Sequence, residues 1–198
     1  MNMDRLETLT RKLVDRRGSR RTVLRVAGAL ALLRLHALDA PTASAAAVAD
    51  ARCPSPATAY GYRSHRFAQT FEAQHTGTLT RVTIYAVAAG SIKFEIRKTT
   101  RRGKPGKTVL ASAQVIEIDR PLTDQTTPVT VEFTPGARVI KGERYALAIA
   151  GVAGSSPNVQ ANSDPGCAGA LFDDNDLDNT FRRISGNDIV FATFVTKA

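Results

Sequence analysis

The acidic sequence DDNDLDN, which begins at residue 173, is the best candidate in this chain for cation binding. Ca²⁺ takes roughly six to eight oxygen ligands from closely spaced carboxylates and carbonyls. Asp174, Asp176 and Asp178 have the alternate spacing that opens an EF-hand loop. The sixth loop position is Asn179 rather than Gly, and the twelfth is Ser185 rather than Glu, so this is not an EF-hand. A looser Ca²⁺ site and a solvated turn both remain open.

A second concentration of charge is basic, since residues 101–107 read RRGKPGK. Arg101 and Arg102 are candidate ligand-binding residues, because they could contact phosphate or an acidic polymer through charge alone. A nucleic-acid module would add interleaved aromatic side chains for base stacking, and none occurs in this segment. We therefore expect no nucleic-acid partner, and the alternative to a binding role is a solvated hairpin tip.

Aromatic side chains that could stack on sugar rings are scarce, because the chain has four Tyr and no Trp. Tyr60 and Tyr62 are the candidate ligand contacts. Their alternative role is to pack a lead-in segment onto the rest of the fold. Tyr85 and Tyr145 lie in expected strands, where we expect them to face the core.

Catalysis has little support in the sequence. His65 and His75 are the candidate bases in the body of the chain, and neither lies in a G-x-S-x-G, H-E-x-x-H or comparable motif. We predict no catalytic residues and no enzyme activity, with a secreted hydrolase as an alternative because distant residues can converge in a fold. We expect no cofactor, apart from the Ca²⁺ discussed above.

The chain has two cysteines, Cys53 and Cys167. In an exported domain an even pair favours a disulfide, which here would tie an early segment to a late loop. Two unrelated buried thiols are the alternative. A metal site is disfavoured because no C-x-x-C spacing exists.

The N-terminal segment 1–47 holds nine of the 27 Lys and Arg residues and four of the 18 Asp and Glu residues, so it carries +5 of the net +9. Within it, Ser19, Arg20, Arg21 and Leu24 belong to the run SRRTVLR. This run resembles the twin-arginine export motif, which implies export by the twin-arginine machinery as a partner. The uncharged run Val26–Leu33 that follows is far shorter than the ~20 residues of a membrane span.

Small residues follow the apolar run in the pattern of a cleavage site. The triplets ending at Ala45 and at Ala47 predict cutting after one of these two residues. We therefore expect a helical export signal over 1–47 and a mature protein that is secreted or lies outside the membrane at the cell envelope. A retained cytosolic basic helix is the alternative.

The rest of the chain shows alternation of apolar and polar residues with Gly and Pro turns between the runs, which predicts half-buried strands. Ile92, Phe94 and Ile96 point one way, while Lys93, Glu95 and Arg97 point the other. Eight strands are expected, at 67–73, 79–87, 91–98, 108–118, 128–134, 143–150, 157–162 and 188–196. The fold class is therefore all-β, an antiparallel, jelly-roll-like β-sandwich over 65–198 after an extended lead-in over 48–64. We expect the last strand to be central, because it is apolar on both faces.

Four short sequences in this body, FAQTF, GTLTRV, GKTVLA and GERYAL, resemble a recurrent jelly-roll module of secreted bacterial proteins. The resemblance covers about residues 65–196. It implies a non-catalytic module that binds carbohydrate, cell-surface material or a partner protein. The expected function is therefore binding of a cell-envelope or extracellular polymer or a surface protein, with a Ca²⁺-dependent adhesive module using residues 173–179 as an alternative.

Overall fold

The computed structural model describes residues 46–54, 60–86, 90–113, 116–118, 128–163, 167–174, 178 and 180–198. In these ranges the chain forms strands, bridges, turns and bends, and all strand pairs are antiparallel, which confirms the all-β class. The expected export signal, with Ser19, Arg20, Arg21 and Leu24, lies outside the described residues. No helix in the described ranges is long and apolar enough to cross a membrane.

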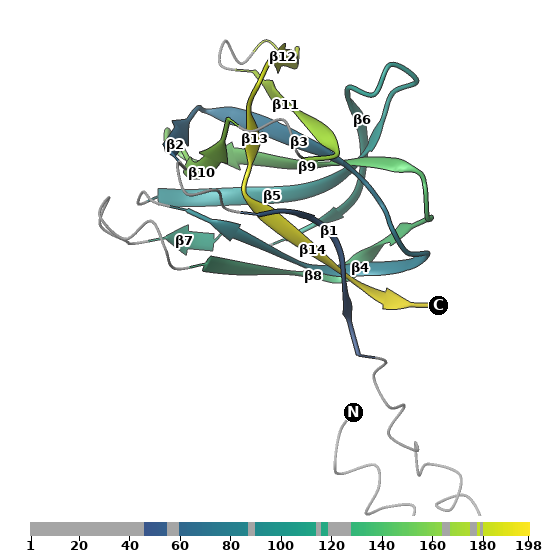
Figure 1. The fold of residues 1–198 in the computed structure, drawn as a ribbon. Coiled ribbons are helices and arrows are strands. Elements are labelled where there is room, and N and C mark those ends of the chain that lie inside the picture. Colours follow the sequence, from purple (N-terminus) through teal and green to yellow (C-terminus); the bar gives the residue numbers. More distant parts are fainter. Residues whose placement is uncertain are drawn as a thin grey trace, which may run out of the picture. The chain divides into compact units, whose positions relative to one another are not determined.

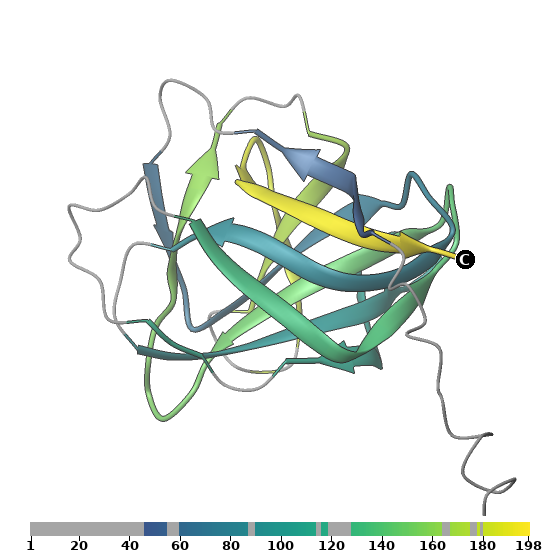
Figure 2. The ribbon, with the colours of Figure 1, turned by 90° about the horizontal axis from the view of Figure 1, so that it is seen from below.

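One layer of the fold is a four-stranded sheet. Its strands, in spatial order, are β1 (Val48–Cys53), β14 (Phe191–Lys197), β4 (Gly77–Tyr85) and β8 (Pro128–Val139). They occupy the lower part of Figure 1, and Figure 2 shows the same sheet from below. The last strand is interior to the sheet, as expected. Its outward side is only partly covered, since Phe194 is half-buried, with the guanidinium carbon of Arg81 4.1 Å from the centroid of its ring.

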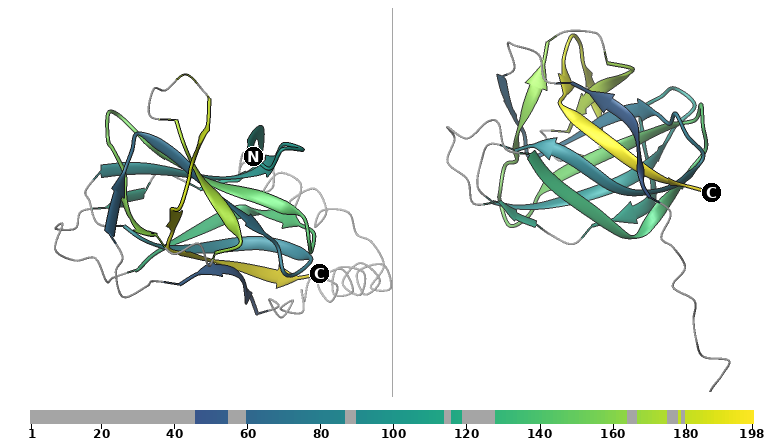
Figure 3. Two further views of the ribbon diagram at one scale, coloured as in Figure 1. Left: turned by 45° about the horizontal axis from the view of Figure 1, so that its top comes forward. Right: turned by 60° about the horizontal axis from the view of Figure 1, so that its bottom comes forward.

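The opposite layer is a seven-stranded sheet, which lies above the first in Figure 1. Its main path is β12 (Arg182–Ile184), β11 (Gly169–Asp173), β3 (Arg66–Glu72), β9 (Arg144–Gly151), β5 (Gly90–Thr99) and β6 (Pro105–Ser112), with β7 (Ile116–Ile118) also paired to β5. Figure 3 shows both layers from two further directions. A smaller sheet of β13 (Asp188–Ile189), β10 (Asn158–Asn162) and β2 (Tyr60–Arg63) lies beside them, and Val159 bridges to Ala86.

The hydrophobic core lies between the two larger sheets, so the architecture is sandwich-like. The alternation along each strand places apolar side chains inward, because successive residues of a strand point to opposite faces. Fully buried side chains from the two layers meet in one cluster that includes Leu79, Val82, Ile84, Phe67, Phe71, Phe94, Ile96, Leu147 and Ile149. This packing fixes which residues of the seven-stranded sheet face outward.

The expected disulfide is present. Cys53, at the end of β1, is bonded to Cys167, with their Cα atoms 5.2 Å apart and a sequence separation of 114. The segment 48–64, expected to be an extended lead-in, contains the two strands β1 and β2. The alternation of apolar and polar residues in these two strands is too short to be recognised in the sequence. Their pairing partners are distant in sequence, since β1 pairs with β14 and β2 with β10.

Candidate functional site

The outward face of the seven-stranded sheet has a floor of small side chains. Across four strands, Phe172, Ala68, Ala148 and Glu95 are neighbours in register. The next row holds Ala170, Thr70, Ala146 and Arg97. Alanine fills little space above a sheet, so longer side chains at the margins enclose a hollow.

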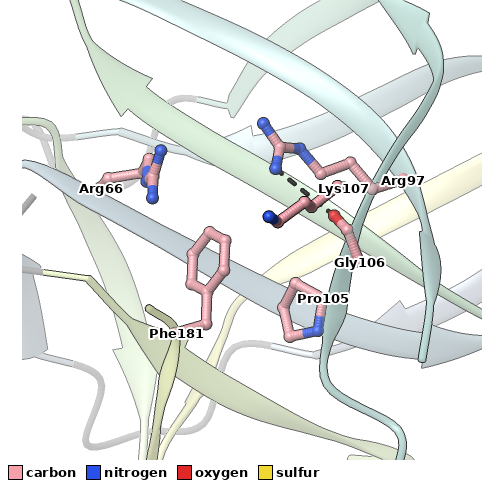
Figure 4. A pocket seen from close by; sticks show the side chains of 6 residues that line it. All are labelled: Arg66, Arg97, Pro105, Gly106, Lys107 and Phe181. Carbon is pink, nitrogen blue, oxygen red and sulfur yellow. Dashed lines mark hydrogen bonds between the residues drawn. The ribbon is translucent and has the colours of Figure 1, made fainter. Parts of the chain in front are cut away.

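The hollow is a pocket of about 350 Å³, near the lower end of the range for small-molecule sites. Among the described residues, those that line it are Arg66, Arg97, Pro105, Gly106, Lys107 and Phe181. Figure 4 shows Arg66 and Phe181 on one side and Pro105, Lys107 and Arg97 on the other. Three cationic side chains and two apolar rings thus face one space, which suits an anionic group carried on a partly apolar body.

Arg66 is held by partners on two sides. Its guanidinium pairs with Asp174, whose side chain is fully buried, and its carbonyl oxygen accepts the Asp174 N–H at 2.9 Å. The guanidinium carbon also lies 5.0 Å from the centroid of the Phe181 ring, within range of a cation–π contact. Burial, followed by the nearby charge of Arg97, lowers the pKa of Arg66 from its usual value. The two arginines therefore repel each other across the pocket.

Arg97 is positioned by the carboxylate of Glu95, which also pairs with Lys93. Its Nε donates to Oε2 of Glu95 at 2.7 Å, while Lys93 Nζ lies 2.7 Å from Oε1 of the same side chain. Burial alone would raise the pKa of Glu95, but the hydrogen bonds from Lys93 and Arg97 outweigh it and leave that pKa below its usual value. Glu95 is thus ionised at neutral pH and fixes the guanidinium plane of Arg97.

The hairpin between β5 and β6 contributes Lys107 and the backbone of Gly106 to the pocket. Lys107 is exposed, with no ion pair to another described residue. Arg101 and Arg102, the residues singled out by their charge, are exposed in the preceding turn and do not line the pocket. The turn closes with a 2.8 Å bond from Thr100 N to Lys104 O.

The alternation in β5 predicts that Lys93, Glu95 and Arg97 lie on one face, and it is the signal for the Arg97 side of the pocket. Arg66 carries the same kind of signal, because it alternates with the inward Phe67. Phe181 had no such signal, since it lies just before the short strand β12 and is 7% exposed over Ala68 and Ala148.

The two candidate tyrosines lie on β2, in the smaller sheet. Tyr62 packs edge-on against Phe67, with ring centroids 5.8 Å apart, and its hydroxyl donates to Oδ2 of Asp173 at 2.7 Å. Ser64 donates to the other oxygen of Asp173 at 2.6 Å. Tyr62 thus packs β2 onto the seven-stranded sheet and does not line the basic pocket. Tyr60 pairs with Ala161 through the backbone, and its side chain is outside the description.

The acidic segment is only partly described. Asp174 pairs with Arg66, Asp178 lies 2.7 Å from Arg182, and Asp176 falls outside the described residues. In the ranges that the structure describes, no three His, Cys, Asp or Glu side chains gather in a way that could hold a metal ion. The Ca²⁺ site therefore stays a prediction.

The two candidate histidines, His65 and His75, make different contacts. Nδ1 of His75 lies 3.1 Å from the buried carboxylate of Asp50, which also accepts the backbone N–H groups of Gln74 and His75. Nδ1 of His65 lies 3.0 Å from Oγ of Ser156 in an exposed position. The second pair has the distance of a nucleophile and a base, but neither histidine lines the pocket.

Comparisons with known proteins add little to this geometry. No protein-family model and no curated protein matches the chain. Among solved structures, it is similar to the cysteine protease and lectin-like domains of Cwp84, a surface-layer-associated protein of Clostridium difficile. The TM-score is 0.48 with 14% identity, covering 73% of this chain and 37% of that one. This degree of similarity does not assign the chain to a family.

Proposed function

We propose that this protein is an exported, non-catalytic module with a jelly-roll-like β-sandwich, which binds a cell-envelope or extracellular polymer or a partner protein. The basic pocket over the alanine floor is the observation that carries the binding role. It is preformed by the ion pairs of Arg66 and Arg97 and by the packing of Phe181.

Export is supported by the disulfide between Cys53 and Cys167, because such bonds persist in oxidising compartments outside the cytoplasm. The position of β1 agrees with this proposal. That strand begins at Val48, so cleavage after Ala45 or Ala47 would leave it whole. The motif at Ser19, Arg20, Arg21 and Leu24 supplies the proposed route.

Export is tested by expressing the full chain in a bacterium that has a twin-arginine pathway and then fractionating the cells. We expect an extracytoplasmic form that begins at Ala46 or Val48 and whose intact mass is two hydrogens below the reduced value. Replacing Arg20 and Arg21 together by Lys should retain the chain in the cytoplasm. A wild-type chain that stays full-length in the cytosol with free thiols would overturn export.

Binding is tested separately by co-sedimentation of the purified, disulfide-intact protein with isolated cell-envelope fractions. We expect the protein to sediment with at least one fraction and to release no soluble fragment from it. Failure to sediment with any fraction would contradict the binding role, whatever the outcome for export.

A secreted hydrolase is the second candidate, and the contact between Ser156 and His65 is the observation that favours it. Turnover of an envelope polymer that is abolished by both Ser156→Ala and His65→Ala would establish this alternative. The conservative variant Ser156→Thr serves as a control, because it keeps the hydroxyl.

A further inference from the structure

The three cations around Phe181 indicate the chemical class of the ligand. We propose that the pocket of Arg66, Arg97 and Lys107 binds the anionic group of an acidic polysaccharide, either a carboxylate or a sulfate ester, while the sugar body packs against Phe181 and Pro105. This inference rests on the binding role proposed above and names the ligand class for the same site.

Arg97 has hydrogen-bonding capacity left for such a group. A guanidinium carries five N–H donors in a planar fork that suits two oxygens of one anion. In the described structure, Nε and one Nη2 hydrogen bind Glu95, and Nη1 donates to Gly106 O at 3.4 Å. The remaining N–H groups belong to a side chain whose orientation is already fixed, so a ligand anion would not have to order it.

An anion would also relieve a repulsion that is built into the pocket. Arg66 and Arg97 line the same pocket, and the charge of Arg97 helps to lower the pKa of Arg66. Lys107 adds a third positive charge. The negative charges nearby are already paired with cations, Asp174 with Arg66 and Glu95 with both Arg97 and Lys93, while Asp178, which also acts on Arg66, is paired with Arg182. The exposed Arg101, Arg102 and Lys104 extend the positive potential along the hairpin, which would attract a polyanion over a Debye length of about 10 Å.

The shape of the site favours a sugar over a nucleic acid. Single-stranded nucleic acids need aromatic rings exposed for base stacking along a groove. Phe181 is largely covered and has Arg66 on its ring, so it offers a limited apolar wall rather than a stacking platform. Phe181 and Pro105 are both largely buried, so they offer the C–H surface of one sugar unit a small apolar edge, in a pocket of about 350 Å³.

The test measures binding of the full, disulfide-intact chain to matched polymers by isothermal titration calorimetry. Polygalacturonate is compared with its methyl-esterified form, and dextran sulfate with dextran, so that the two arms separate carboxylate from sulfate. A single-stranded oligonucleotide and poly-glutamate represent other polyanions. We expect binding to a charged glycan, loss with its neutral counterpart, and weaker binding to the other polyanions.

Two variants locate the binding in the pocket. Lys107→Gln removes an exposed charge without a described partner, and Arg97→Lys keeps the charge beside Glu95 but loses the planar fork. Each should weaken glycan binding by about three- to tenfold, with circular dichroism and the melting temperature confirming the fold. Lys197→Gln, on β14 in the opposite sheet, is the matched control and should bind as the wild type does.

The remaining outcomes each decide against the inference. Binding to neutral glycans or to envelope protein, unaffected by Lys107→Gln, would overturn the anionic ligand and leave the general binding role in place. Equal affinity for all polyanions, reduced equally by Lys107→Gln and Lys197→Gln, would indicate unspecific charge attraction. Absence of binding to any charged glycan would overturn the inference, and the sedimentation experiment would then decide the general role.

Discussion

Asp50 and His75 join the first strand of the sandwich to the turn between β3 and β4. The carboxylate of Asp50 accepts the backbone N–H of His75 at 2.7 Å and that of Gln74 at 2.9 Å, and it lies 3.1 Å from the imidazole. This side chain is fully buried. One carboxylate therefore satisfies two backbone donors that a turn leaves without partners.

Replacing Asp50 by Ala should reduce the free energy of unfolding by about 1–3 kcal/mol, because two backbone donors lose their acceptor. Asp50→Asn keeps an oxygen in place and should cost less. Urea denaturation of the three proteins measures the difference. Equal stability of Asp50→Ala and wild type would mean that water replaces the carboxylate without loss.

The disulfide should account for a large part of the stability. Reducing Cys53–Cys167, or replacing both residues by Ser, should lower the free energy of unfolding by about 2–5 kcal/mol, because the bond closes a long loop in the unfolded chain. The midpoint of urea unfolding with and without reductant measures this. The double Ser variant is the control, since reductant should leave its midpoint unchanged.

Glu95 should make stability depend on acidity. The pKa of Glu95 is lowered in the folded protein. Its contribution to the free energy of unfolding is therefore fully present above the ordinary carboxyl pKa, and it is lost as the pH falls through the lowered pKa of the folded protein. Glu95→Gln should therefore be less stable than the wild type at pH 7, by about 1–3 kcal/mol, with a gap that narrows below pH ~4.5. Urea unfolding across pH 3–7 checks this, and a gap independent of pH would contradict it.

Added Ca²⁺ should leave the melting temperature unchanged. Asp174 is already paired with Arg66 and Asp178 with Arg182, so a cation would have to displace an arginine to reach either carboxylate. Differential scanning calorimetry with millimolar CaCl₂, and with MgCl₂ as the control, measures the effect. A rise seen with Ca²⁺ alone and lost in the double variant Asp174→Ala, Asp176→Ala would support the adhesive-module alternative.

Local patterns in the sequence predict most of the sandwich but little of its pocket. The alternation of Ile92, Phe94 and Ile96 with charged residues is a property of a single strand, and it correctly places both faces of β5. Charge alone predicts Arg101 and Arg102 as ligand-binding residues, because they are neighbours in sequence. The pocket instead joins Arg66, Arg97 and Phe181, which are brought together by strand pairings between distant segments.

The smaller strands were missed for a related reason. The strand β11 is short and has no alternation long enough to recognise, and it is formed by pairing with β3. Gly169 lies so close to this neighbour that a Cβ there would be 1.9 Å from the carbonyl oxygen of Thr70. A single sequence does not reveal that close approach, because glycine is also a usual residue of turns.

The pairing of β1 with β14 has a consequence for the order of events during synthesis. The strand β14 lies between β1 and β4, so the four-stranded sheet lacks an interior strand until residues 191–197 have left the ribosome. Before β14 is available, β1 has no neighbouring strand in its sheet. The pairing of β1 with β14 therefore cannot yet hold Cys53 in place for its bond to Cys167. The four-stranded sheet can therefore be completed only after residues 191–197 have been synthesised.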